Sequence, residues 1–253
     1  MKYIASALLI LTLCTALSAC NAGAVAEMPA PESTDPVTAP ASEPSLTLHH
    51  FGHIGYWLYS PENSRPGLKL VVYLHGGSGK GSDASLVLQN GFPKLLKEGL
   101  LGRPNCYILI PQLSDEYRDW AEMQSDLFAL LDDVAARFDI DGICLTGHSM
   151  GGTATWTLAL AAPERFCCIV PLSGSIQNTA ENRAALSKLP VRAFVGSEDT
   201  IVSPRQSIAF IRALQKNNPN AQITVIPGAD HFAVPDAYTD EKYDILGWML
   251  SQS

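Results

Sequence analysis

The sequence predicts an α/β fold, a mainly parallel twisted sheet of about eight strands with helices on both faces. Short apolar segments rich in β-branched residues alternate with helix-length segments from residue 46 onward. The segment 120–138 places Leu127, Leu130, Leu131 and Val134 at helical spacing, which is typical of an amphipathic helix. The predicted strands are 46–48, 54–59, 68–74, 106–110, 142–146, 166–172, 191–195 and 222–226, and the predicted helices are 92–98, 120–138, 151–162, 204–217 and 240–251.

The segment 146–152, Thr-Gly-His-Ser-Met-Gly-Gly, lies between a predicted strand and a predicted helix. A G-x-S-x-G motif in that setting is typical of a nucleophile elbow, a tight turn that exposes a serine hydroxyl above the sheet edge. Gly147 and Gly151 lack a Cβ and so permit close approach of strand and helix. The motif predicts Ser149 as a nucleophile. The alternative is a glycine-rich loop before an ordinary helix.

A second glycine motif follows the predicted strand 68–74, which continues into His75, Gly76 and Gly77. Such a loop can offer backbone N–H groups to the oxyanion of a tetrahedral intermediate. We expect the N–H of Gly76 or Gly77 to act with the N–H of Met150 as an oxyanion hole. His75 is expected to be a structural, hydrogen-bonded histidine. An ordinary glycine-rich turn remains the alternative for this loop.

Two further loops carry the groups that a serine nucleophile needs. Glu198 and Asp199 follow the predicted strand 191–195, where one carboxylate could orient a catalytic imidazole. Both could instead be solvated loop charges that cap the helix beginning near residue 204. His231 follows the last predicted strand and is the expected general base, whereas the neighbouring Asp230 is expected to stabilise its own loop. The order serine, acid, histidine is that of the α/β-hydrolases.

Over about residues 50–250 the chain resembles the single-domain α/β-hydrolase esterases, which are related to the prolyl oligopeptidase catalytic domain, dienelactone hydrolase and feruloyl or acetylxylan esterases. The resemblance rests on the segments 73–79 (Tyr-Leu-His-Gly-Gly-Ser-Gly), 109–112 (Leu-Ile-Pro-Gln), 146–152, 196–199 (Gly-Ser-Glu-Asp) and 228–231 (Gly-Ala-Asp-His). It implies an α/β-hydrolase fold, Asp199 as the acid of the triad, and ester hydrolysis through an acyl-enzyme without a metal or an organic cofactor.

The substrate is indicated only in outline. Fewer residues separate positions 172 and 190 than a helical lipase lid needs, which predicts a minimal lid and an open cleft for short-chain or carbohydrate-linked esters. Trp120 and Phe232 are expected to line this cleft. Two alternatives stay open: a serine peptidase of the prolyl oligopeptidase type acting on small peptides, and a non-catalytic binding lipoprotein on a hydrolase scaffold.

The N-terminal segment predicts export. Met1 and Lys2 precede an apolar run over residues 3–17, and the segment 17–20, Leu-Ser-Ala-Cys, is similar to a bacterial lipobox. We expect a signal peptide over 1–19, lipidation at Cys20, a flexible Pro- and Ala-rich tether over 20–45, and a catalytic domain over 46–253. Asn21 favours the outer membrane in a Gram-negative host. An ordinary secretory signal with an incidental cysteine is the alternative.

Net charge and cysteine content limit the partners, disulfides and metal sites that the sequence supports. A net charge of -8 argues against nucleic acid binding, which depends on cationic contacts with phosphate. No basic amphipathic helix is evident, so the lipid is the expected membrane contact. The cysteines beyond the tether are Cys106, Cys144, Cys167 and Cys168. Export makes a disulfide possible, but core packing explains most of these positions, and no C-x-x-C or histidine cluster indicates a metal site.

Overall fold

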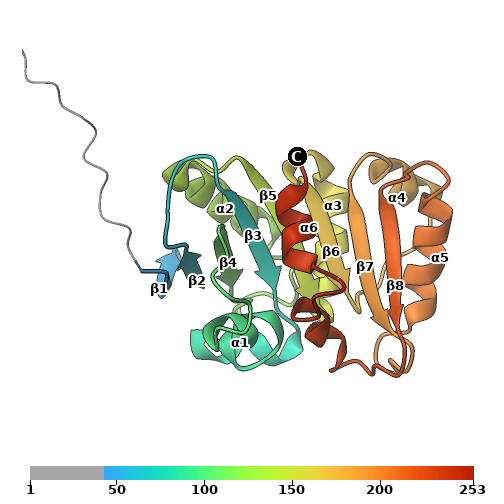
Figure 1. The fold of residues 1–253 in the computed structure, drawn as a ribbon, viewed down its shortest axis with the longest axis horizontal. Coiled ribbons are helices and arrows are strands. Elements are labelled where there is room, and N and C mark those ends of the chain that lie inside the picture. Colours follow the sequence, from blue (N-terminus) through green and yellow to red (C-terminus); the bar gives the residue numbers. More distant parts are fainter. Residues whose placement is uncertain (1–42) are drawn as a thin grey trace, which may run out of the picture. The chain divides into compact units, whose positions relative to one another are not determined.

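An eight-stranded sheet forms the centre of the computed structural model, which describes residues 43–253 (Figure 1). The strand order is β1-β2-β4-β3-β5-β6-β7-β8. β1 and β2 form an antiparallel hairpin at one edge, and the six strands from β4 to β8 run parallel. The predicted fold class is therefore confirmed. The strands are β1 (Ser45–Phe51), β2 (Ile54–Ser60), β3 (Lys69–Leu74), β4 (Tyr107–Pro111), β5 (Gly142–His148), β6 (Cys168–Leu172), β7 (Val191–Gly196) and β8 (Ala221–Ile226).

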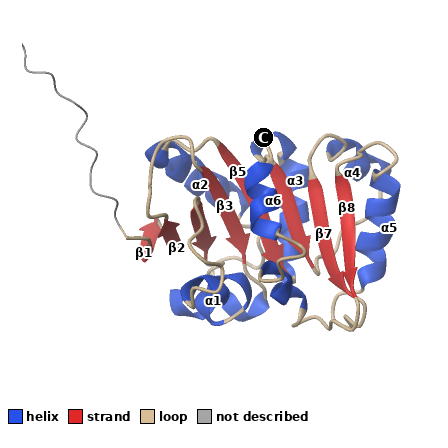
Figure 2. Cartoon of the chain, in the orientation of Figure 1, coloured by secondary structure: helices blue, strands red, loops and turns tan. Residues whose placement is uncertain are grey.

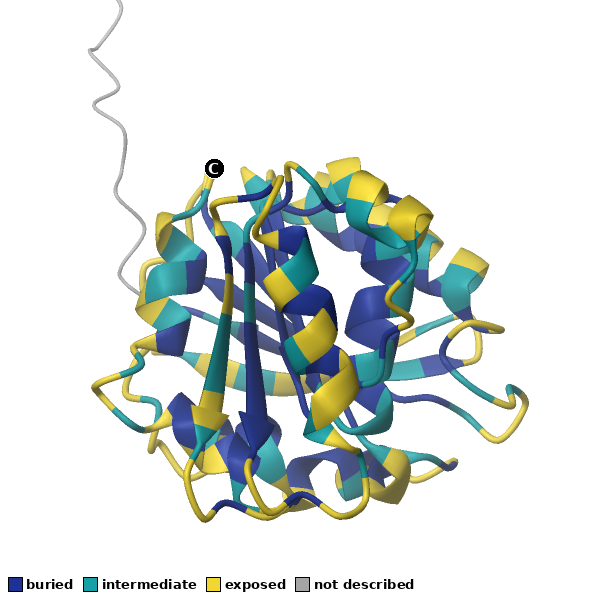
Figure 3. Ribbon diagram, turned by 90° about the vertical axis from the view of Figure 1, so that its right-hand side faces the viewer, coloured by how far each residue is buried: buried dark blue, intermediate teal, exposed yellow. Residues whose placement is uncertain are grey.

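The central strands are apolar because helices cover both of their faces. Every residue of β4 and β6 is buried, as is all of β3 after its first residue. A strand buried on both faces reads as a continuous hydrophobic run rather than an alternating one. Figure 3 shows these strands buried along their length, while the outer faces of the helices are exposed.

The helices form two layers, each with its own hydrophobic core (Figure 2). On one face of the sheet lie α2 (Gln124–Phe138), α3 (Met150–Ala161) and α5 (Pro204–Leu214). On the other lie α1 (Gly91–Lys97), α6 (Ile245–Ser251) and the 3-10 segments η2 (Ala84–Gln89) and η4 (Val234–Tyr238). Of the helices in the described part of the chain, none is long and apolar enough to cross a bilayer.

Register brings three loops to the same sheet edge. β3 pairs with β5 up to Leu74 and Gly147, and β5 pairs with β6 up to His148 and Leu172. The carboxyl ends of these parallel strands are therefore level, and the loops that follow them meet. Ligands of open parallel sheets bind at this edge.

Helix ends differ from the sequence prediction. The second helix begins at residue 124 instead of 120, the helix from Pro204 ends at Leu214, and the last helix begins at Ile245 instead of 240. Asp244 has φ 40° and caps the N–H of Gly247, so the chain before it cannot continue as helix. The short α4 (Ala180–Ala185) and the 3-10 segments η2 and η4 were not predicted.

The predictions for the N-terminal segment fall largely outside the described residues. These are the signal peptide over 1–19, lipidation at Cys20 and the tether over 20–42. The described residues of the predicted tether end at Ser45, which is the first residue of β1. The four cysteines beyond this point are free thiols, and three of them are buried in the core.

Candidate active site

Ser149 occupies a sharp turn between β5 and α3. Its backbone has φ 60° and ψ -119°, a conformation that non-glycine residues rarely adopt. Hydrogen bonds on both sides hold it there: the Ser149 N–H donates to the Leu172 carbonyl at 3.0 Å, and the Thr153 N–H donates to the Ser149 carbonyl at 2.9 Å. The strand, turn and helix expected from the motif are thus all present.

The glycines of the motif are required by close backbone contacts. A Cβ on Gly151 would overlap the Leu74 carbonyl and lie 2.7 Å from the His75 carbonyl oxygen. A Cβ on Gly147 would lie 2.6 Å from the Leu74 carbonyl oxygen. Because both clashes are with backbone, no side-chain rotation relieves them. The end of β3 can reach the first turn of α3 only in the absence of these two side chains.

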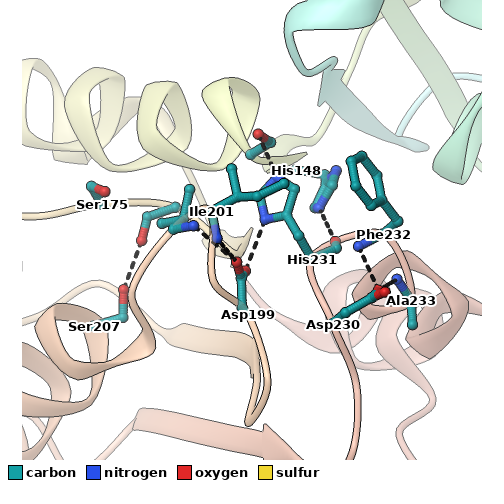
Figure 4. Close-up of polar contacts among 12 residues, drawn as sticks. His148, Ser175, Asp199, Ile201, Ser207, Asp230, His231, Phe232 and Ala233 are labelled. Carbon is teal, nitrogen blue, oxygen red and sulfur yellow. Dashed lines mark hydrogen bonds and ion pairs between the residues drawn. The ribbon is translucent and has the colours of Figure 1, made fainter.

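The three residues of the predicted triad form one hydrogen-bonded chain. The Ser149 Oγ and His231 Nε2 are 2.8 Å apart, and His231 Nδ1 lies 2.8 Å from Asp199 Oδ2. The second carboxylate oxygen, Oδ1, accepts the backbone N–H groups of Ile201 at 3.0 Å and Val202 at 2.8 Å (Figure 4). The loops after β5, β7 and β8 supply the three side chains.

Electrostatics around Asp199 favour its ionised form. Burial by itself raises the pKa of this carboxyl, but the hydrogen bonds from His231 and from the Val202 N–H outweigh burial and hold the pKa below its usual value. Asp199 therefore presents a charged acceptor to the imidazole. It also holds the loop after β7 through Ile201 and Val202, but it is buried and does not cap α5, whose N-cap is Ser203, so the alternative of a solvated helix cap does not hold for Asp199.

The neighbouring acids lie elsewhere. Glu198 is exposed, whereas Asp199 is buried. Asp230 Oδ1 accepts the N–H groups of Phe232 and Ala233, each at 2.9 Å, and so shapes the loop that carries His231 (Figure 4). The expectation that Asp230 stabilises its own loop is confirmed.

Backbone N–H groups without a partner among the described residues lie near Ser149. A Cβ on Gly76 would lie 3.3 Å from Ser149 Cβ and 3.8 Å from its Oγ, so this loop passes directly beside the hydroxyl. The N–H groups of Gly76 and Gly77 have no acceptor within the described residues. Met150 is the first residue of α3, so its N–H has no partner inside the helix. Gly76 and Gly77 line the same cavity as Ser149, and Met150 follows it in the chain, so the three N–H groups remain candidates for an oxyanion hole.

His75 is structural, as expected. Its Nδ1 lies 2.6 Å from the Gly76 carbonyl oxygen, and its Nε2 accepts the Leu113 N–H at 3.0 Å. Since Leu113 can only donate, the ring proton belongs on Nδ1. Burial lowers the pKa of His75 to about 4, so the ring is neutral at neutral pH. The imidazole thus fastens the loop of Gly76 and Gly77 to the chain after β4.

The prediction that Trp120 lines the cleft is wrong. The side chain is only 1% exposed, packs edge-on against the ring of His75, and donates from Nε1 to the His75 carbonyl at 3.2 Å. Its indole thus packs beneath the loop of Gly76 and Gly77, through its contacts with His75. Phe232, in contrast, is 73% exposed and lines the cavity beside Ser149.

A cavity of about 280 Å³ opens beside the serine hydroxyl. One wall contains Ser149, His231 and Phe232. The opposite wall comes from η2 and the start of α1, a segment that the sequence did not mark as part of the site; it includes Leu86, Val87, Asn90 and Gly91. This segment follows the loop of Gly76 and Gly77 directly, and only that adjacency could have indicated it.

A second histidine was also missed. His148 Nε2 lies 2.8 Å from the His231 carbonyl oxygen, and the two rings lie 4.7 Å apart (Figure 4). Burial, followed by the nearby His231, lowers the pKa of His148 to about 4, so the neutral ring donates its Nε2 proton to that carbonyl. His148 precedes Ser149 in the motif, and this position was the available signal. In the described part of the chain, no group of three or more potential ligands is placed to hold a metal ion.

Solved structures with this architecture include several esterases. A thermostable esterase aligns with TM-score 0.65 and 22% identity. The alignment covers 83% of this chain but only 63% of the esterase. The feruloyl esterase module from Clostridium thermocellum, solved as a mutant with sinapinate, aligns with TM-score 0.63 and 16% identity, covering 89% of this chain and 94% of the module. A putative dienelactone hydrolase from Klebsiella pneumoniae aligns with TM-score 0.54 and 21% identity, covering 77% and 89% of the two chains.

At these identities the alignments establish the fold. A search of curated proteins found no match. The family model described as "Dienelactone hydrolase family" matches residues 104–249, a span that contains Ser149, Asp199 and His231 and more than half of the sequence. The chain therefore belongs to the dienelactone hydrolase family of α/β-hydrolases.

Proposed function

We propose that the protein hydrolyses carboxylic esters through an acyl-enzyme, with Ser149 as nucleophile, His231 as general base and acid, and Asp199 as the group that orients the imidazole. The observation that carries this proposal is the unbroken hydrogen-bonded chain, 2.8 Å from Ser149 Oγ to His231 Nε2 and 2.8 Å from His231 Nδ1 to Asp199 Oδ2. Membership of a hydrolase family and structural similarity to esterases support the same chemistry.

The proton path follows from the hydrogen bonds. Asp199 accepts the Nδ1 proton, which leaves Nε2 free to take the hydroxyl proton as Ser149 attacks the ester carbonyl. The N–H of Met150 and that of Gly76 or Gly77 stabilise the resulting oxyanion. His231 then returns the proton to the departing alcohol, and a water molecule activated by the same imidazole releases the acid.

The likeness to esterases and the size of the cavity favour short-chain or carbohydrate-linked esters. At about 280 Å³ the cavity is smaller than most pockets for drug-sized ligands, which measure roughly 300–1,000 Å³. The described segment between β6 and β7 contains one short helix, α4 (Ala180–Ala185), so nothing larger covers the sheet edge there. An open, small cavity suits a soluble ester.

Turnover of p-nitrophenyl acetate by Ser149→Ala tests the proposal. We expect a fall of about 10⁴-fold or more, because the remaining oxyanion donors alone provide little rate. Ser187→Ala is the matched control, since this half-buried serine lies outside the cavity and its hydroxyl bonds only the nearby Ala184 carbonyl. A fluorophosphonate probe should label the control and not Ser149→Ala. Retained turnover in Ser149→Ala rejects the assignment.

We also propose, from the sequence alone, that the protein is exported and anchored to a bacterial membrane by lipid on Cys20. Incorporation of radiolabelled palmitate into the full chain, compared with Cys20→Ser, tests this. Equal labelling of the two proteins contradicts it.

A further inference from the structure

We propose that the cavity beside Ser149 binds a compact, uncharged ester group that carries a neutral oxygen, recognised by the Tyr73 hydroxyl and the Asn90 amide. This inference rests on the proposed function and deepens it by naming a substrate class. Its basis is the charge, size and unused polar groups of the cavity.

Apart from His231, the proposed general base, no residue that lines the cavity could pair with a charged substrate at neutral pH. Among the described residues that line it there is no Lys, Arg, Asp or Glu. His75 and His148 also line it, and burial lowers the pKa of each to about 4, so both rings are neutral at neutral pH. A carboxylate entering here would lose its water without gaining a cation. The net charge of -8 adds repulsion at long range.

Volume limits the group to a compact one. A water molecule occupies about 30 Å³ in the liquid. With a similar volume for each heavy atom, a cavity of about 280 Å³ holds roughly nine heavy atoms. Apolar side chains close its sides, among them Leu86, Val87 and Pro235. A short acyl group fits within these walls, whereas a long fatty chain would extend into solvent.

Tyr73 supplies a fixed hydrogen-bond donor. The residue is only 3% exposed, and its ring stacks on Phe92 and meets the edge of Tyr238, which sets its direction. Burial raises the pKa of Tyr73, partly offset by the hydrogen bond from the Phe92 N–H, so the hydroxyl keeps its proton. Within the described residues no acceptor takes that proton. Because Tyr73 lines the cavity, a ligand oxygen placed there could accept this proton.

Asn90, which is exposed, offers a second polar group to the same cavity. It occupies the N-cap position of α1, where asparagine usually bonds the first helical N–H groups, yet its side chain makes no capping bond. The residue is one of those that line the cavity. The next residue, Gly91, has φ +57°, and a Cβ there would lie 2.9 Å from the Tyr73 hydroxyl. The glycine therefore leaves room for this hydroxyl.

Three ethyl esters of similar size test the inference with the full chain. Ethyl hexanoate is uncharged and apolar, ethyl 4-methoxybutanoate is uncharged with an ether oxygen, and monoethyl glutarate carries a carboxylate. We expect kcat/KM for the glutarate to be at least about 100-fold below that for hexanoate, since an unpaired buried charge is strongly unfavourable. We expect a preference of about fivefold for methoxybutanoate over hexanoate, the size of one hydrogen bond.

Variants locate the recognition. In Tyr73→Phe and in Asn90→Leu the preference for methoxybutanoate over hexanoate should fall toward one. In the control Tyr59→Phe, a buried tyrosine outside this cavity, the ratio should persist. The ratio within one variant is independent of how much of that variant folds. Turnover of the glutarate within threefold of hexanoate overturns the inference, as does an unchanged ratio in both site variants. Absence of turnover with all three esters overturns the proposed function itself.

Discussion

Replacing Asp199 by asparagine should stop turnover while leaving the fold intact. The carboxylate bonds in two directions: Oδ1 accepts the N–H groups of Ile201 and Val202, and Oδ2 faces His231 Nδ1 at 2.8 Å. An amide has only one oxygen. If this oxygen faces the two backbone N–H groups, the amide nitrogen must donate to Nδ1, and the imidazole proton moves to Nε2. Nε2 can then no longer accept the proton of Ser149.

The opposite rotamer does not rescue the enzyme. It would leave the two partly buried backbone N–H groups facing an amide nitrogen, and each unsatisfied donor costs at most about 1–3 kcal/mol. Two such donors cost at most about 2–6 kcal/mol, so the inactive arrangement is favoured by a factor of at most about 30 to 3 × 10⁴. We expect kcat to fall by about 10³–10⁴, in line with the loss when the triad tautomer is wrong. The free energy of unfolding should change by less than about 1 kcal/mol, because the amides of Ile201 and Val202 keep their acceptor.

The assay is kcat for p-nitrophenyl acetate at pH 7 together with urea unfolding of both proteins. Glu198→Gln is the matched control, because it removes an adjacent carboxylate that is exposed. The control should keep kcat within about twofold, as surface substitutions usually do little. A kcat for Asp199→Asn within tenfold of the unmodified enzyme would refute the reasoning about the tautomer.

Two further predictions concern the oxyanion loop. Gly151→Ala should destabilise the protein by about 2 kcal/mol or more and lower kcat by about 100-fold, because the added Cβ overlaps the Leu74 carbonyl and must displace the loop after β3. The control is Gly77→Ala, which should be far milder in urea unfolding because nothing lies within 4 Å of its Cβ. Equal losses of stability in the two variants would contradict the steric argument. Burial lowers the pKa of His75 to about 4, so the unfolded chain takes up this proton first. As pH drops from 6.5 to 4, His75 should contribute about 3 kcal/mol to the loss of stability, in addition to the contribution of His148, whose pKa is lowered in the same way. Urea unfolding of His75→Asn should therefore show a smaller pH slope than the unmodified protein, and an unchanged slope would rule out a contribution from His75.

The strands could be predicted because burial on both faces leaves a strong local signature. All eight were located from apolar runs, and each run ends within three residues of the observed strand. Helix ends were less accurate because tertiary contacts set them. Residue 120 was placed in a helix, but the indole of Trp120 is tied to the His75 carbonyl in another loop, and α2 starts four residues later. The sequence around residue 120 could not predict this contact, because His75 lies 45 residues earlier in the chain.

Parts of the site could also be predicted from short segments of the sequence. Ser149 and the glycines around it lie in one short segment, whose steric demands dictate its composition. The cavity wall could not be predicted from one short segment, because it combines residues that are distant in the sequence. Tyr73, Asn90 and Gly91 line the same cavity as Ser149 only because β3, α1 and α3 converge at one edge of the sheet. The role of Trp120 was inferred wrongly for the same reason, since aromatic residues near a site can support it from beneath as readily as line it.

By itself the sequence determined the α/β fold, the turn that carries Ser149, and the loops from which an acid and a histidine approach it. Those features depend on residues close together in the chain, where hydrophobic periodicity and the missing Cβ atoms of glycines leave a readable pattern. Only the tertiary structure decided that Asp199 and not Glu198 faces His231, that His148 supports the His231 loop, and that an uncharged cavity adjoins the serine. Each of these depends on the direction of a side chain across a gap between loops, which is fixed by packing and hydrogen bonds between distant segments.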